Sequence, residues 1–297
     1  SYNKIKFVDM KYPLHALLYF ILIFSCATKS PISNRYVSKK KNIDHLVKLG
    51  NLNWEKRVDI KSAKLSKHFL SKAIELDGNN PETIALFSRS CYFNGRYLNY
   101  DNPDLADSLF IEGYKTAWNF IIRDQNYQFG FQSVDGDSVT KKIAGLEKLS
   151  GKTLHIAYWW AENFTSYLLT KPVLKRLENR EVIETVLHRI LSKDPGYNFH
   201  GANRIFGSFY AKLPGVSLEQ AKNNFDKTIS SEPNFMTSYL MRAQFFYTKN
   251  GDRDSFIKDL RFVLNAEPTR IPEASPENLF EQELAKILLS KEESLFE

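Results

Sequence analysis

The stretch IETVLHRILSKDP (183–195) carries a spacing that the chain repeats twice more, as AKNNFDKTISSEP (221–233) and FIKDLRFVLNAEP (256–268). In each copy small or apolar residues stand at offsets 0, +4 and +7, and a proline stands at offset +12. Residues three or four apart share one face of an α-helix, and proline ends a helix because it lacks a backbone N–H. A weaker copy, SKHFLSKAIELDG (66–78), has glycine in place of the proline. The pattern predicts helices that each bury one stripe and then stop.

The prolines of the three copies are 38 and 35 residues apart. This is close to the roughly 34 residues of a tetratricopeptide unit, in which a pair of helices stacks on the next pair. Such a pair cannot bury its apolar stripe alone, so several pairs must stack. We therefore predict an all-α fold, a superhelix of tetratricopeptide-like repeats with about eleven to thirteen helices and no strands, in one domain over residues 43–297.

One interval interrupts the helical pattern. The segment QNYQFGFQSVDGDSVTKKIAGLEKLSG (125–151) is rich in glycine and has few long apolar runs. Glycine is unfavourable inside helices because it loses the most backbone freedom on folding. We predict an insertion between an N-terminal and a C-terminal helical half, with one short helix near residues 138–149.

The N-terminal region has the pattern of a secretory signal. The apolar run LHALLYFILIF (14–24) is too short for a membrane-spanning helix, which needs about 20 residues, but it fits the core of a signal peptide preceded by Lys11. The sequence Ile23-Phe24-Ser25-Cys26 that ends it resembles the lipobox of bacterial lipoproteins. We predict a lipoprotein signal peptide over residues 1–25, lipidation of Cys26 and a flexible, basic tether over residues 26–42. The alternative is an ordinary signal peptide with an incidental cysteine.

Replacing Cys26 tests this prediction. Each acyl CH₂ that enters a bilayer contributes about 0.8 kcal/mol, so Cys26→Ala should release the protein from membranes or leave its signal peptide uncleaved. Membrane fractionation and mass spectrometry give the answer, and an unchanged distribution with an unchanged mass would exclude the lipoprotein. Ala27, rather than aspartate, at the following position favours the outer membrane if the host sorts lipoproteins as enterobacteria do.

The distribution of charge bears on which molecules the protein can bind. The formal net charge is +7, and the basic residues are interspersed with carboxylates along the predicted helices. A nucleic-acid-binding surface would need a clustered basic stripe, so we expect no nucleic acid as a partner.

If Cys26 carries lipid, Cys91 is the one remaining thiol and no internal disulfide can form. Cys91 lies in an apolar helical run, and we predict that it is a buried small side chain.

The sequence contains no recognisable catalytic or metal-binding motif. It lacks G-x-S-x-G, the P-loop pattern and G-x-G-x-x-G, and its six histidines form no H-x-x-x-H pair. We therefore expect no enzyme, no cofactor and no metal site. A helical peptidoglycan-active enzyme would require a buried glutamate in a sugar-binding cleft, and no glutamate stands in a clearly apolar setting.

Two segments resemble a known family. The motif AYWWAENFTSYLL (157–169) and the stretch 187–268, with its PGVSLEQAKNNF and DRDSFIKDLRFVL helices, are similar to the T component (TatT) of TRAP, the tripartite ATP-independent periplasmic transporters. The resemblance implies a lipid-anchored periplasmic protein that docks the solute-binding P component. It also implies a homo-oligomer, with a trimer suggested, and a hollow in the helical body that passes a small solute. The last helix, LFEQELAKILLSKEE (279–293), departs from the family pattern.

The candidate ligand residues are the aromatics that lie outside the repeat-packing positions, together with one arginine. They are Tyr158, Trp159, Trp160, Phe199, Tyr239 and Arg242. Adjacent residues on a helix point about 100° apart, so the first three either divide between packing layers or place one ring in the hollow. Tyr239 and Arg242 share a helix face, where they either bind a carboxylate or remain solvated. A solute-handling protein should place at least two of the six on one shared cavity.

These observations leave three classes of function. The first is a TRAP-associated lipoprotein that docks the P component and handles a small solute. The second is a general tetratricopeptide scaffold for envelope-protein assembly, and the third is a peptidoglycan-active enzyme.

Overall fold

The computed structural model describes residues 31–297, so Cys26 and the predicted signal peptide lie outside the described residues. The chain divides into two compact units at Asn42 and Ile43. In the first unit, residues 31–42 form the beginning of helix α2 (Pro31–Glu55), and the side chains of residues 36–42 are exposed. The segment for which composition predicts a flexible tether is thus helical from Pro31 onward.

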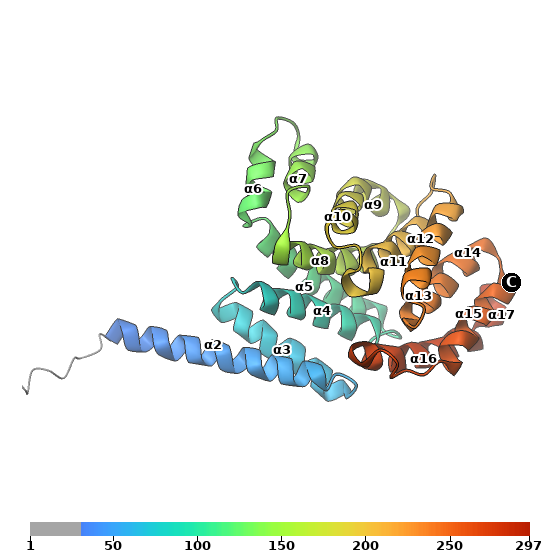
Figure 1. Cartoon of the computed structure of the whole chain (residues 1–297), viewed down its shortest axis with the longest axis horizontal. Coiled ribbons are helices and arrows are strands. Elements are labelled where there is room, and N and C mark those ends of the chain that lie inside the picture. Colours follow the sequence, from blue (N-terminus) through green and yellow to red (C-terminus); the bar gives the residue numbers. More distant parts are fainter. Residues whose placement is uncertain (1–30) are drawn as a thin grey trace, which may run out of the picture. The chain divides into compact units, whose positions relative to one another are not determined.

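The second unit, Ile43–Glu297, contains helices and no strand. After the end of α2, its elements in chain order are α3 (Ile60–Leu76), α4 (Pro81–Arg96), α5 (Pro103–Ile121), α6 (Gln125–Gln132), α7 (Ser138–Leu146), α8 (Gly151–Leu169), α9 (Val173–Glu178), α10 (Arg180–Lys193), α11 (Tyr197–Ala211), α12 (Leu218–Ser231), α13 (Met236–Met241), the π-helix η1 (Arg242–Tyr247), α14 (Thr248–Asn250), α15 (Arg253–Asn265), the 3₁₀ turn η2 (Pro272–Ala274), α16 (Ser275–Ser290) and α17 (Glu292–Leu295) (Figure 1). The predicted all-α fold is confirmed. The helices outnumber those expected because one- and two-turn elements such as α9 and α14 stand between the longer ones.

The repeated spacing marks the buried stripe of α3, α10, α12 and α15. All twelve residues at its offsets 0, +4 and +7 are buried: Ser66, Leu70, Ala73, Ile183, Leu187, Ile190, Ala221, Phe225, Thr228, Phe256, Leu260 and Val263. Helices α10, α12 and α15 end two or three residues before their prolines, and α12 packs on α11 as α15 packs on α16. The repeat alignment is therefore confirmed. Cys91 is buried and free, as predicted.

The glycine-rich interval forms two helices, one more than expected. Helices α6 and α7 make an antiparallel hairpin, and α7 packs on α10 (Figure 1). A Cβ atom on Gly130 would collide with the backbone carbonyl of Ala144, and one on Gly145 would lie 2.8 Å from the ring of Tyr127. The glycines thus allow two helices to cross closely. Their low helix propensity is outweighed by this packing.

The stripe residues of the three strongest repeats make a stability prediction. Leu187, Phe225 and Leu260 are each fully buried, so truncating any of them to alanine should lower the free energy of unfolding by about 2–5 kcal/mol. Urea unfolding followed by circular dichroism measures this loss. Leu174→Ala, at a position that is 60% exposed, is the control and should cost far less. Equal losses at buried and exposed leucines would contradict the repeat alignment.

Candidate functional site

A small cavity lies among helices from both halves of the second unit. Its volume is about 20 Å³, enough for about one water molecule. Its lining comes from α4 and the turn after it (Arg89, Tyr92, Phe93, Tyr97), α8 (Trp159, Glu162), α11 (Asn198, Phe199, Arg204), α13 with its N-cap residue (Phe235, Thr237) and α16 (Glu277). Aromatic rings and buried charges meet here.

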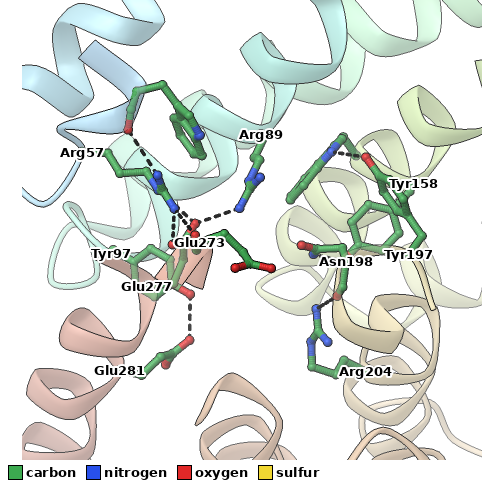
Figure 2. A network of polar contacts seen from close by, with 12 residues as sticks. Arg57, Arg89, Tyr97, Tyr158, Tyr197, Asn198, Arg204, Glu273, Glu277 and Glu281 are labelled. Atoms are coloured by element: carbon green, nitrogen blue, oxygen red, sulfur yellow. Dashed lines mark hydrogen bonds and ion pairs between the residues drawn. The ribbon is translucent and has the colours of Figure 1, made fainter. Parts of the chain in front are cut away.

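On one side of the small cavity, helix α16 is held by arginines from the N-terminal repeats. Glu277 accepts hydrogen bonds from Arg57 at 2.7 and 3.1 Å and from Arg89 at 3.1 Å (Figure 2). Arg57 also donates to the carbonyl oxygen of Glu273 at 2.6 Å. Both guanidinium groups lie over the ring of Trp54, at 4.4 and 4.9 Å from its centre. Glu277 therefore bridges two cations across a sequence separation of about 200 residues.

One turn further along α16, Glu281 makes a second buried ion pair. Its carboxylate accepts two hydrogen bonds of 3.1 Å from Arg96 and one of 2.7 Å from the Tyr97 hydroxyl. Burial and the Glu281 charge raise the pKa of Tyr97 well above its usual value, so the phenol stays protonated. Phe280 packs beside them, with its ring 5.4 Å from Phe93. We call Arg57, Arg89, Arg96, Glu277 and Glu281 the ionic seam.

The opposite wall of the small cavity contains a carboxyl group that is not part of any ion pair in the described chain. Glu162 on α8 is 4% exposed and accepts a hydrogen bond from Tyr158 one turn before it. The Tyr158 hydroxyl accepts in turn from the Asn198 side-chain amide at 2.7 Å. Burial raises the pKa of Glu162, while the Arg204 charge and the Tyr158 hydroxyl oppose that rise.

The backbone beside Glu162 adopts an unusual conformation. Asn198, Phe199 and His200 have φ values of 48°, 55° and 56°, in the left-handed region that non-glycine residues seldom occupy. Arg204, itself 2% exposed, donates to the carbonyl oxygens of Asn198 and Phe199 and so holds the segment (Figure 2). The ring of Phe199 stacks on Phe235, 4.4 Å away. Such conformations concentrate at functional sites.

Two of the six candidate ligand residues line the small cavity, namely Trp159 and Phe199. The Trp159 indole N–H donates to the Tyr197 hydroxyl at 3.1 Å, and Arg89 lies 5.4 Å from the ring centre. Tyr158 lies beside them without lining the cavity and binds Glu162. The adjacent aromatics on α8 thus divide between different surroundings.

The other three candidates serve packing and ion pairing. Trp160 packs on Trp118 and Phe164, with ring centres 5.5 and 5.2 Å away. Tyr239 stacks on Phe262 at 4.0 Å and donates to the Pro233 carbonyl. Arg242 is neutralised by Asp226 at 2.7 Å and by Asp259 at 2.8 Å. Because the guanidinium group of Arg242 already binds two carboxylates, it has no free pair of N–H donors for the carboxylate of a ligand.

A larger cavity lies on the other side of Glu162. Its volume is about 290 Å³, and its walls come from α4, α5, α8, α11, α13 and η1, with the turn after α4 and the residues that follow α8 and α11. Tyr92 and Glu162 line both cavities and therefore form the wall between them. None of the six candidate residues lines the larger cavity.

The charged residues of the site were missed by the sequence reasoning. Glu162 stands in the run AYWWAENF, an apolar setting of the kind in which no glutamate was identified. The feature of the sequence that could have identified Glu162 is its position as a single charged residue within the aromatic part of the helix. Arg57, Glu277 and Glu281 had no such signal, because their partners are about 180 to 220 residues away.

Residues 31–297 include no group of three or more histidine, cysteine, aspartate or glutamate side chains placed to hold a metal ion. Within the same part of the chain, no helix has the length and apolar character required to cross a membrane.

Together, the fold and the site define a tetratricopeptide-like helical-repeat protein with internal cavities among its helices. The family model of the TRAP transporter T-component matches residues 99–296, about two thirds of the chain. The chain belongs to this family and is therefore a component of a TRAP transport system. A comparison with curated proteins found no match. The matched range contains α8, α11, α13 and α16, whereas Arg57, Arg89 and Arg96 of the ionic seam lie before it.

Proposed function

We propose that this protein is a lipid-anchored periplasmic T component that docks the solute-binding P component and receives a small solute in its helical body. The observation that carries the proposal is the pair of cavities that share a wall at Tyr92 and Glu162, inside a chain of the T-component family. A mainly apolar hollow with a few polar groups is the usual form of a small-molecule site. The motif at Cys26 supports the lipid anchor, and homo-oligomerisation follows from the family resemblance.

Binding of the P component tests the docking role. Purified residues 27–297, which lack the predicted signal peptide and lipid, should bind the P component of the same transport system in biolayer interferometry. Binding should be saturable, and an unrelated solute-binding protein should not compete. Mass spectrometry of material captured from the cell envelope supplies a second readout. Recovery of assembly factors without any P component would favour the general scaffold and contradict the proposal.

A further inference from the structure

The larger cavity has the size and composition of a ligand site. Its 290 Å³ is close to the lower limit for small-molecule pockets. Most of its exposed lining is apolar, from rings and aliphatic chains that include Tyr100, Phe110, Ile205, Met241 and Phe245. An apolar body of moderate length would therefore fill most of this space.

One wall of the larger cavity has a carboxyl group without a cationic partner and a hydroxyl group without any hydrogen-bond partner in the described chain. Within the described chain, no lysine, arginine or histidine nitrogen lies within ion-pair distance of Glu162, which accepts a hydrogen bond from the Tyr158 hydroxyl. Thr165, three residues later on α8, is 2% exposed, and its hydroxyl has no hydrogen-bond partner there. Buried polar groups are nearly always paired, so the unpaired Thr165 hydroxyl, on the same helix face as a carboxylate with no cationic partner, indicates a missing partner.

The charges around the larger cavity determine which partner fits. Arg96 lines it but is bound at two positions by Glu281, and Asp107 is paired with Lys171. Arg204 lines only the small cavity and is occupied by two carbonyl oxygens. Lys212 also lines the larger cavity and makes no ion pair in the described chain, but it is exposed to solvent. The buried charge that faces the larger cavity without a direct counterion is the carboxylate of Glu162.

An ammonium group would supply both the counterion that Glu162 lacks and the hydrogen-bond partner that Thr165 lacks. Its three N–H donors can bind a carboxylate and a threonine hydroxyl together, and the ring of Tyr92 adds a favourable face for a cation. A carboxylate in the same place would face the like charge of Glu162. An alcohol would form the hydrogen bonds without the attraction between charges.

We propose that the larger cavity binds a primary amine carried on an apolar body. The ammonium contacts Glu162 and Thr165, and the body lies along Phe110, Ile205 and Phe245. This assignment rests on the proposed function for its role in solute transfer. Binding itself is measured on this protein alone, so its failure is distinguishable from failure of P-component docking.

Three probes with the same chain and different head groups test the proposal: n-octylamine, n-octanol and n-octanoate. Isothermal titration calorimetry at neutral pH should show octylamine binding at one site, at least about tenfold more tightly than octanol, with octanoate weakest. Glu162→Gln should lower the octylamine affinity to that of octanol and leave octanol binding nearly unchanged. Octanoate binding as tightly as octylamine, or octylamine binding that Glu162→Gln does not weaken, would overturn the assignment.

Two further variants guard against indirect effects. Glu178→Gln removes an exposed carboxylate and should not change the octylamine affinity. If octylamine bound only through non-specific attraction to negative charge, Glu178→Gln and Glu162→Gln would lower its affinity alike. Thr165→Val keeps the size of the side chain and should weaken octylamine binding severalfold even if Glu162→Gln fails to fold. If Thr165→Val binds octylamine as tightly as the unmodified protein does, the assignment is contradicted, whatever the result for P-component docking.

Discussion

Glu281→Ala is expected to lower the free energy of unfolding by about 3–5 kcal/mol, more than most single substitutions in a protein of this size. Glu281 is fully buried and accepts hydrogen bonds from Arg96 and Tyr97. Truncation leaves the guanidinium of Arg96, which is 11% exposed, without its counterion. Removing one partner of a buried ion pair is costly because the other charge stays buried. Urea unfolding followed by circular dichroism measures the change.

A carboxylate on the same helix is the matched control. Glu283 is 65% exposed, and its one ion-pair partner in the described part of the chain is Lys286, so Glu283→Ala should change stability by no more than about 0.5 kcal/mol. A second variant, Arg96→Met with Glu281→Met, removes both charges and should recover most of the loss, because apolar residues of similar volume can replace a buried pair. If the single and double variants lose the same stability, the uncompensated charge is not the cause.

The ionic seam matters to the site because it joins repeats that are distant in sequence. Glu277 and Arg89 line the small cavity directly, and Glu281 holds the same helix one turn further along. Weakening the seam therefore loosens one wall of the cavity as well as the contact between α16 and the N-terminal repeats. Docking and solute handling by seam variants are best compared at temperatures at which each variant remains folded.

The repeat fold was predictable because its signal is local. The residues at offsets 0, +4 and +7 of each copy lie on one helix face, and the last of them are Ile190, Thr228 and Val263. The proline at +12 marks the end of the helix. Burial of the whole stripe followed from periodicity alone. The hairpin of α6 and α7 was missed because the same glycines that disfavour a helix in isolation permit the close crossing at Gly130.

The site was less predictable for two physical reasons. The ionic seam depends on partners such as Arg57 and Glu277, and periodicity carries no information about which distant helix a charge will meet. The left-handed backbone at Asn198 and Phe199 depends on Arg204, five or six residues later, and nothing in the sequence FHGANR required it. Aromatic content pointed to α8, which contributes residues to both cavities, but it could not separate Trp159 from Trp160.

The two tryptophans provide a matched pair for the site. Each is 4% exposed, so Trp159→Ala and Trp160→Ala should both lower the free energy of unfolding by about 3–5 kcal/mol. Trp160 contacts Trp118 and Phe164, away from either cavity, whereas Trp159 lines the small cavity and contacts Arg89 of the ionic seam. The variants are thus matched in burial and expected stability loss but differ in their relation to the site.

Only Trp159→Ala should then alter binding. At a temperature at which both variants are folded by circular dichroism, we expect its affinity for the P component to fall about tenfold, equivalent to about 1.4 kcal/mol. Loss of the indole removes the support of Arg89 and the hydrogen bond to Tyr197, so the wall that faces Glu277 loses its fixed shape. Trp160→Ala should bind as the unmodified protein does. Equal affinities for the two variants would mean that the small cavity takes no part in docking and that both rings act through stability alone.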